Sequence, residues 1–191
     1  MSLALLPIHD CRHNYKDFTI HNSPFTMITL TEGSKAPTFK AKDQNGKDIS
    51  LADYKGQKII LYFYPEDDTP TCTIQACNLR DNYGLLKNNG FVVLGVSPDE
   101  EKKHKKFEDK YDLPFTLVSD PSHKIIDKYG VWGEKKLYGR EYMGLHRTTF
   151  LIDEKGVIRK IFIRPKNKQH AEEILKAWNE IQNVSGAAKV S

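Results

Sequence analysis

The sequence predicts an α/β fold with a mixed central sheet flanked by helices. Three observations support this prediction: strand-like apolar runs alternate with helix-like segments, a hairpin signal precedes them, and a second hairpin and a helix follow them. Strands joined through helices are parallel, whereas hairpin strands are antiparallel, so the sheet is expected to be mixed. The 191 residues, 39% of them hydrophobic, suffice for one domain with a full core.

The ordered pattern begins near residue 29. Residues 1–28 have no amphipathic periodicity and are expected to be a flexible appendage, and translation is expected to start at Met27. Residues 39–41 and 48–50 flank Asn45-Gly46, which predicts a hairpin because both residues tolerate turn conformations. Residues 58–64 are rich in Ile, Leu and aromatic residues without polar gaps at helical spacing, which is typical of a buried central strand.

The middle of the chain alternates helix and strand. A helix is predicted over residues 70–87, ended by the segment 88–90, and a buried strand over 91–97. Residues 99–111 predict a helix with one narrow apolar stripe formed by His104, Phe107 and Tyr111. A short strand over 115–118 and a short helix over 122–129 follow.

The last third predicts a hairpin and a helix. Strands over 147–152 and 157–163 surround a turn at 153–156, and residues 170–183 form an amphipathic helix. The segment 185–191 is expected to be a frayed tail, which leaves one domain over residues 29–184. This arrangement is thioredoxin-like, with an added N-terminal hairpin.

Composition excludes several classes of protein. The mean hydropathy of −0.58 and the longest apolar run, residues 59–64, exclude a membrane-spanning helix. The net charge of +4 comes from interspersed charges, so no nucleic-acid partner is expected. Three cysteines are too few for a disulfide scaffold, and no basic segment precedes the apolar residues 3–8, so we expect a cytoplasmic protein.

The strand-to-helix junction at residues 64–77 carries the chemistry. Thr69-Pro70 has the form of an N-cap followed by the first helical residue, which puts Cys72 at the third helical position. The free N–H groups and dipole of a helix N-terminus favour the thiolate, which is the nucleophilic form of cysteine. On an ideal helix the Cα atoms of Cys72 and Cys77 would be ~9 Å apart, which is too far for a disulfide. The two cysteines can therefore bond only if the helix unwinds; otherwise Cys77 belongs to the core.

The motif Pro65-x-x-x-Thr69-x-x-Cys72 resembles the signature of the peroxiredoxins. Thr73-x-x-Ala76-Cys77, followed by Arg80-Asp81, resembles their bacterioferritin comigratory protein (PrxQ) subgroup. Five later segments extend the resemblance over roughly residues 30–183, namely 95–99, 110–115, 117–120, 129–132 and 147–153.

The resemblance implies a thiol peroxidase for hydrogen peroxide and organic hydroperoxides. Cys72 would attack the peroxide and become a sulfenic acid, and Cys77 would resolve it as an intramolecular disulfide. Thr69 would orient the peroxide, Pro65 would shield the sulfenic acid, and Arg147 would hold the thiolate and stabilise the departing oxygen. The resemblance also implies thioredoxin as reductant, a monomer, and no metal, haem or flavin cofactor.

One departure from the subgroup is Thr71, where a glycine is usual; a β-branched residue there predicts a stiffer loop. Two other functions stay open. A thiol:disulfide oxidoreductase shares the fold but carries Cys-x-x-Cys, and a redox sensor or holdase would bind a partner when oxidised and turn over little. Structural roles also stay open for Cys72 as a buried thiol, for Arg147 as a surface ion-pair partner and for Thr69 as a cap.

Other chemistry-bearing residues are interpreted as structural. Cys11 is expected to be inert, and the potential ligands among residues 9–13 are a chance cluster in a flexible leader. Residues 43–46 form a hairpin turn and lack the later ligands of a calcium loop. Acidic neighbours make the lysines of the helix 99–111 a solvated face.

Overall fold

The computed structural model describes residues 29–137 and 139–187. Four expectations therefore lie outside the described residues: the N-terminal appendage, the translation start at Met27, the inert Cys11 and the chance cluster at 9–13. The frayed tail was predicted over residues 185–191. The final helix includes residues up to Ala187, and residues 188–191 lie outside the described part, so fraying there stays a prediction.

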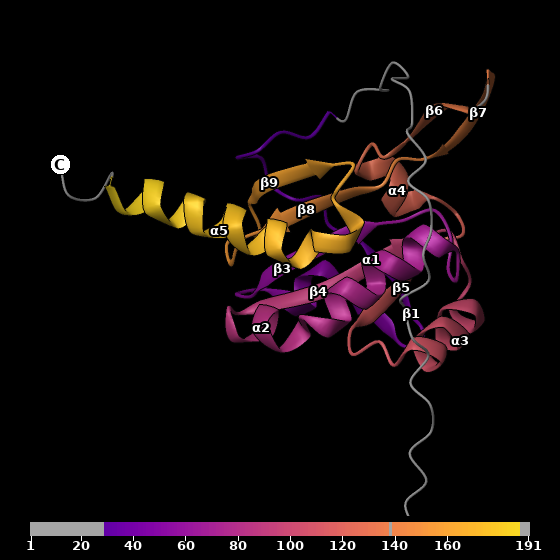
Figure 1. Cartoon of the computed structure of the whole chain (residues 1–191), viewed down its shortest axis with the longest axis horizontal. Coiled ribbons are helices and arrows are strands. Elements are labelled where there is room, and N and C mark those ends of the chain that lie inside the picture. Colours follow the sequence, from indigo (N-terminus) through magenta and orange to yellow (C-terminus); the bar gives the residue numbers. More distant parts are fainter. Residues whose placement is uncertain (1–28, 138, 188–191) are drawn as a thin grey trace, which may run out of the picture.

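A seven-stranded mixed sheet forms the centre of the protein, as the sequence predicts (Figure 1). Its strand order is β2-β1-β5-β4-β3-β8-β9. The central strand β3 pairs in parallel with β4 and antiparallel with β8, which places it between the helix-linked half and the C-terminal hairpin. The strands are β1 (Lys40–Asp43), β2 (Asp48–Ser50), β3 (Lys58–Phe63), β4 (Phe91–Ser97), β5 (Thr116–Ser119), β8 (Thr148–Ile152) and β9 (Ile158–Ile163).

Helices cover both faces of the sheet. Helices α1 (Pro70–Asp81), α2 (Tyr83–Asn88), α3 (Glu101–Tyr111) and α5 (His170–Ala187) share one hydrophobic cluster with the sheet, and α4 (Lys124–Lys128) packs in the cluster on the other face. Alternate residues of β3 divide between them: Ile60 and Tyr62 belong to the first cluster, Ile59 and Leu61 to the second. Two short 3-10 helices, η1 (Leu51–Tyr54) and η2 (Asn167–Gln169), precede β3 and α5.

The predicted helix over 70–87 is wrong as one continuous element. It ends at Asp81, and a second helix begins at Tyr83, because Asn82 leaves helical geometry at φ −103° and ψ 8°. The Asn82 side chain donates to the carbonyl oxygen of Asn78, a local bond that competes with the helical ladder. The predicted C-terminal stop is correct, since Gly90 follows α2 in the left-handed region at φ 81°.

A second, two-stranded sheet was not predicted. Strands β6 (Trp132–Leu137) and β7 (Arg140–Leu145) form an antiparallel hairpin that projects beside α4 in Figure 1. Its strands carry charged residues and little apolar alternation, so the periodicity that reveals a half-buried strand is missing. Lys135, on β6 of this hairpin, bears on the site described below.

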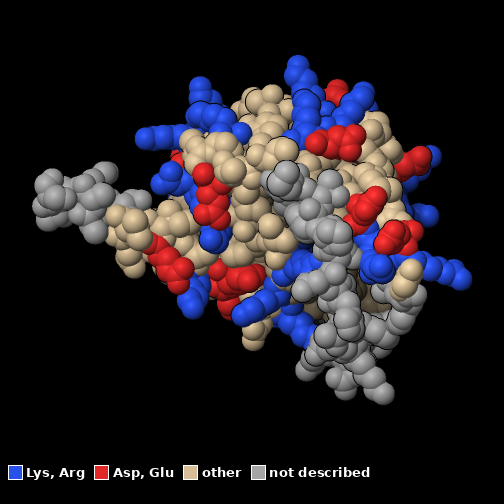
Figure 2. Space-filling model, turned by 90° about the horizontal axis from the view of Figure 1, so that it is seen from above, with Lys and Arg blue, Asp and Glu red and all other residues tan. Residues whose placement is uncertain are grey.

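The surface is charged but mixed in sign. On the face shown in Figure 2, lysine and arginine lie among aspartate and glutamate. No helix in the described part of the chain is both long and apolar enough to cross a bilayer.

Candidate active site

Cys72 lies where the sequence places it, at the third residue of α1. Thr69 is the N-cap residue in extended geometry, and Pro70 opens the helix, where its missing N–H removes no helical hydrogen bond. Cys72 is a free thiol, only 2% exposed. Thr71 lies within the helix and not in the left-handed region, so this position does not require the glycine that is usual in the subgroup.

Arg147 reaches the sulfur of Cys72 from another element. It directly precedes β8, the strand beside β3, and its Nη2 donates to the Cys72 Sγ over 3.1 Å. A guanidinium keeps its charge at any physiological pH, so this contact favours the thiolate over the thiol. The structure thus brings together two predicted site residues that are 75 positions apart.

Gln75 is a site residue that the sequence analysis missed. It is fully buried one turn after Cys72, and its Oε1 accepts a hydrogen bond from the Arg147 Nη1 over 2.5 Å. Its Nε2 has no hydrogen-bond partner among the described residues. The spacing of three residues from Cys72 was the available signal, because residues three apart share a helix face.

Thr69 and Pro65 flank the loop that leads into α1. The Thr69 Oγ1 donates to the carbonyl oxygen of Glu66 over 3.1 Å, and this side chain makes no capping bond to the helix. The hydroxyl hydrogen is therefore engaged, and its lone pairs remain available to accept a hydrogen bond. Pro65 is half-buried and follows the end of β3 by two residues.

Two buried tyrosines on the core side of the site feel the charge of Cys72. Burial raises the pKa of Tyr62 well above its usual range, and the nearby Asp67 and Cys72 add to the rise. Burial also raises the pKa of Tyr64, with further contributions from Tyr62, Asp67 and Cys72. Both phenols therefore stay neutral beside the thiolate.

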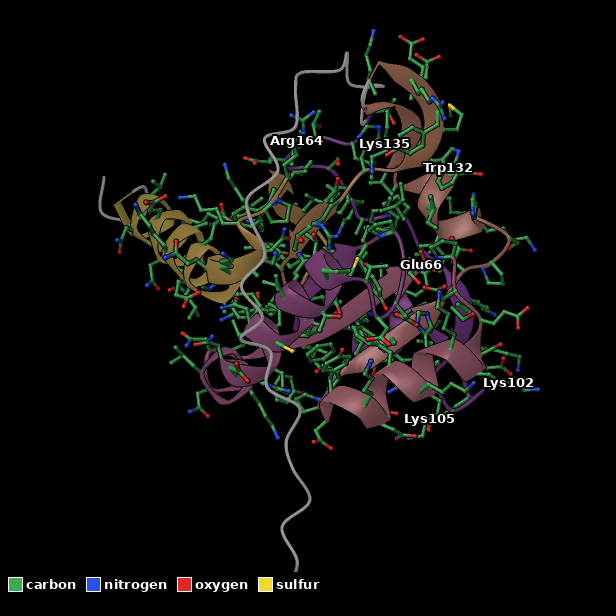
Figure 3. All side chains as sticks on the ribbon, turned by 45° about the vertical axis from the view of Figure 1, so that its right-hand side comes forward. Glu66, Lys102, Lys105, Trp132, Lys135 and Arg164 are labelled. Carbon is green, nitrogen blue, oxygen red and sulfur yellow. The ribbon has the colours of Figure 1, made fainter. Side chains whose placement is uncertain are left out.

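Lys135 brings a second cation within electrostatic reach of Cys72. Partial burial lowers the pKa of Lys135, as do Arg147 and Arg164, while the Cys72 thiolate acts in the opposite direction. Its Nζ donates to the carbonyl oxygen of Leu145 over 2.9 Å, which fixes the side chain across the β6–β7 hairpin. Figure 3 shows Lys135 and Arg164 at the same end of the molecule. Lys135 was not singled out in the sequence analysis, because its hairpin was not predicted.

Cys77 lies deeper in α1 and is 2% exposed. It is disulfide-bonded, and because Cys72 is free, the partner is not Cys72. Both cysteines belong to one continuous helix from Pro70 to Asp81. The two sulfurs are thus held apart in this state, as ideal helix geometry predicts.

The chain also matches a known protein family. The sequence profile of the AhpC/TSA family matches residues 33–161. The chain belongs to the AhpC/TSA family. The resemblance to the peroxiredoxins drawn from the motif is confirmed, and the protein is a thiol peroxidase, an oxidoreductase.

Curated relatives of this AhpC/TSA family protein are similar over most of their length. A putative peroxiredoxin Bcp of Haemophilus influenzae is 48% identical over 149 residues, covering 78% of this chain and 96% of the relative. Peroxiredoxin Bcp of Bacillus subtilis is 44% identical, covering 81% of this chain and 98% of the relative. Peroxiredoxin Bcp of Escherichia coli K12 is 45% identical, covering 78% of this chain and 96% of the relative.

Solved structures of the same group share the fold of this family member. The bacterioferritin comigratory protein of Xanthomonas campestris, studied for its alkyl peroxide reduction activity, matches with a TM-score of 0.70 at 30% identity, over 74% of this chain and 90% of its own. A PrxQ mutant of Xylella fastidiosa matches with a TM-score of 0.72 at 28% identity, over 83% of this chain and 98% of its own. The predicted thioredoxin-like fold is therefore confirmed.

Proposed function

We propose that this peroxidase reduces hydrogen peroxide and organic hydroperoxides with Cys72 as nucleophile and Cys77 as resolving cysteine. One observation carries the proposal: Arg147 Nη2 donates to the Cys72 sulfur at the N-terminus of α1. A helix N-terminus and a fixed cation on the same buried sulfur favour a thiolate, which is the form that attacks peroxides. The activity toward alkyl peroxides studied in the Xanthomonas campestris relative supports organic hydroperoxides as substrates.

The first step forms one bond and breaks one. The Cys72 thiolate attacks the terminal oxygen of ROOH, the O–O bond breaks, and its electron pair leaves with RO⁻, which takes up a proton to become an alcohol or water. The sulfur is oxidised to a sulfenic acid and the peroxide is reduced. Arg147 stabilises the charge on the departing oxygen, and the free lone pairs of Thr69 accept the peroxide O–H. Pro65 shields the sulfenic acid from water.

In the second step, the Cys77 sulfur attacks the sulfenic sulfur, and water leaves as a disulfide forms. This step needs Cys77 as a thiol, so its present disulfide must first be reduced or exchanged. It also needs the first turns of α1 to unwind, because Cys72 and Cys77 share a continuous helix. Thioredoxin, or a similar dithiol, then reduces the disulfide, and the enzyme acts as a monomer.

The test starts from fully reduced protein. One equivalent of hydrogen peroxide is added to the wild type, to Cys77→Ser and to Cys72→Ser, followed by intact mass and peptide mapping. We expect the wild type to lose two hydrogen atoms in a bond between Cys72 and Cys77, and Cys77→Ser to gain oxygen on Cys72. A disulfide mapped between Cys77 and Cys11 would contradict the resolving role, and an unchanged mass in wild type and Cys77→Ser would contradict the nucleophile.

Turnover distinguishes the enzyme from a redox sensor. With thioredoxin, thioredoxin reductase and NADPH, we expect hydrogen peroxide consumption over many equivalents at catalytic enzyme concentration. A sensor would stop after one equivalent. Size-exclusion chromatography of the reduced and oxidised forms tests the monomer.

A further inference from the structure

The acidic loop before α1 is attached to α3 at every acidic side chain. Glu66, Asp67 and Asp68 follow one another in the loop 65–69, which joins β3 to the helix of Cys72. Glu66 accepts from Lys103 Nζ over 2.7 Å, and Asp68 accepts from Lys110 Nζ over the same distance. In Figure 3, Glu66 lies on the side of α3 that faces the rest of the protein. These two outer pairs are solvent-exposed and contribute little by themselves.

The pair between them is different because it is completely buried. His104 of α3 and Asp67 both have side chains with no exposed surface, and the His104 Nδ1 lies 2.7 Å from the Asp67 Oδ2. The second carboxylate oxygen of Asp67 accepts the Tyr64 O–H over 2.6 Å, and the Asp67 backbone N–H donates to Asp99 over 2.7 Å. Asp67 is thus held on three sides, by Tyr64, His104 and Asp99.

Both ring nitrogens of His104 face acceptors. Nδ1 faces the Asp67 carboxylate, and Nε2 lies 3.2 Å from the carbonyl oxygen of Val118 on β5, which can only accept. The Tyr64 oxygen is also 3.4 Å from Nδ1, but its hydrogen is engaged by Asp67. A neutral imidazole has only one N–H, so this environment requires two protons within the pair. The imidazolium form of His104 meets this requirement, because it carries an N–H donor at both ring nitrogens.

A second buried histidine, His170, does not face acceptors at both ring nitrogens. His170 lies between the carboxylate of Glu173 and the hydroxyl of Thr149, which can donate to Nε2. One N–H therefore satisfies both bonds, and burial lowers the pKa of His170. His170 is a neutral reference in the same protein.

We propose that His104 is a positioning residue of the peroxidase: as a buried imidazolium it fixes Asp67, and through the loop 65–69 it sets the place of Cys72 against Arg147. The contact between the sulfur and the guanidinium joins α1 to the start of β8, two separate elements. The end of α1 that carries Cys72 is continuous with this loop, so a displacement of Asp67 moves Thr69 and the first turn. The inference rests on the proposed function.

The cluster is also within electrostatic reach of the nucleophile. Burial raises the pKa of Tyr64 well above its usual range, and the charges of Tyr62, Asp67 and Cys72 contribute to the rise. Tyr64, which directly follows β3, and Asp67 from the loop are the titratable side chains that hydrogen-bond or contact His104 in the described chain, and β5 presents only a backbone carbonyl. Tyr64 thus lies between the pair and the nucleophile, because the charges of both Asp67 and Cys72 act on it.

Protonation is tested directly in the wild type. Nitrogen NMR of the ¹⁵N-histidine-labelled reduced enzyme at pH 7 distinguishes imidazolium from neutral rings, and spectra of His104→Gln and His170→Gln assign the two signals among seven histidines. We expect two protonated nitrogens for His104 and one for His170. One unprotonated nitrogen on His104 overturns the proposal. This readout does not depend on peroxide chemistry, so it stands even if the proposed function fails.

Positioning is tested by kinetics on folded, pre-reduced variants. His104→Gln and Asp67→Asn should each slow the second-order reaction with hydrogen peroxide about tenfold or more, since small misplacements of reacting groups cost that much. Alkylation of Cys72 should shift toward higher pH in both. The double variant should be no slower than the slower single variant, because the residues act as one unit. Lys102→Gln is the matched control: it removes a charge from the exposed side of α3 (Figure 3) and should react like the wild type.

Wild-type rates and pH profiles in folded His104→Gln and Asp67→Asn would refute the positioning role. If neither variant folds, Tyr64→Phe decides, because it keeps the ring and removes only the O–H that holds Asp67. We then expect a slowing of about threefold, as for one buried hydrogen bond. An unchanged rate in Tyr64→Phe would refute the proposal in that case.

Discussion

Arg147 joins Cys72 and Gln75 through two different nitrogens of one guanidinium. Nη2 donates to the sulfur over 3.1 Å and Nη1 to the amide oxygen of Gln75 over 2.5 Å. Because Cys72 and Gln75 lie one turn apart on α1, the guanidinium of Arg147 spans one turn of the same helix face. The amide oxygen of Gln75 thus orients the guanidinium that donates to the Cys72 sulfur.

Replacing Arg147 by lysine should slow the reaction although the charge is kept. An ammonium is a point charge without the planar fork, so it cannot bond Gln75 and the sulfur in the same geometry. We expect the second-order rate constant with hydrogen peroxide to fall about 10²-fold, the typical loss when a fixed donor is removed from a developing anion. Rapid-quench kinetics on pre-reduced enzyme measure it, and a loss below about threefold would refute this role of the fork.

Gln75→Leu should slow the same step by about tenfold, because Arg147 loses the acceptor that orients it. Gln75→Glu is the matched control, since its carboxylate can still accept from Arg147. Its rate should therefore exceed that of Gln75→Leu. If the two variants react equally slowly, packing at position 75 matters and the hydrogen bond to Arg147 does not.

Lys135→Met should make Cys72 react with alkylating agents only at higher pH, because it removes a cation that favours the thiolate. We expect a fall of about threefold in the rate with peroxide near pH 7. The control is Lys136→Met on the same strand, whose ammonium pairs with the exposed Glu141 over 3.2 Å. Equal alkylation profiles in the two variants would exclude a role of Lys135 at the site.

The protein should lose stability as the pH falls through the range of histidine. Burial lowers the pKa of His170 in the folded state. Below about pH 6.5 the unfolded chain therefore binds a proton that the folded chain does not, and the free energy of unfolding decreases. Denaturant unfolding of reduced protein between about pH 6.5 and pH 5 measures this slope. His170→Gln should be less stable at pH 8 by ~1–3 kcal/mol, through its lost buried bonds, and should show a flatter profile; an unchanged slope would contradict the prediction.

The sequence predicted the main sheet well because each of its strands is marked locally. The buried strand over 58–64 and the turn at Asn45-Gly46 need only nearest neighbours to be recognised. The break at Asn82 and the β6–β7 hairpin escaped prediction for different reasons. Asn82 interrupts a helical pattern that continues on both sides, and the hairpin residues are too polar to show a strand period.

By itself the sequence determined where Cys72, the proposed nucleophile, lies. Thr69 and Pro70 start a helix, and a helix start favours a thiolate at Cys72 whatever surrounds it, because the peptide dipoles act within a single turn. The tertiary structure decided which elements bring other groups to that sulfur. Arg147 directly precedes β8, Lys135 lies on the separate β6–β7 hairpin, and His104 holds the loop from α3, so these groups meet only when the separate elements pack together. Such pairings carry no local signal, since their geometry depends on how the strands and helices pack.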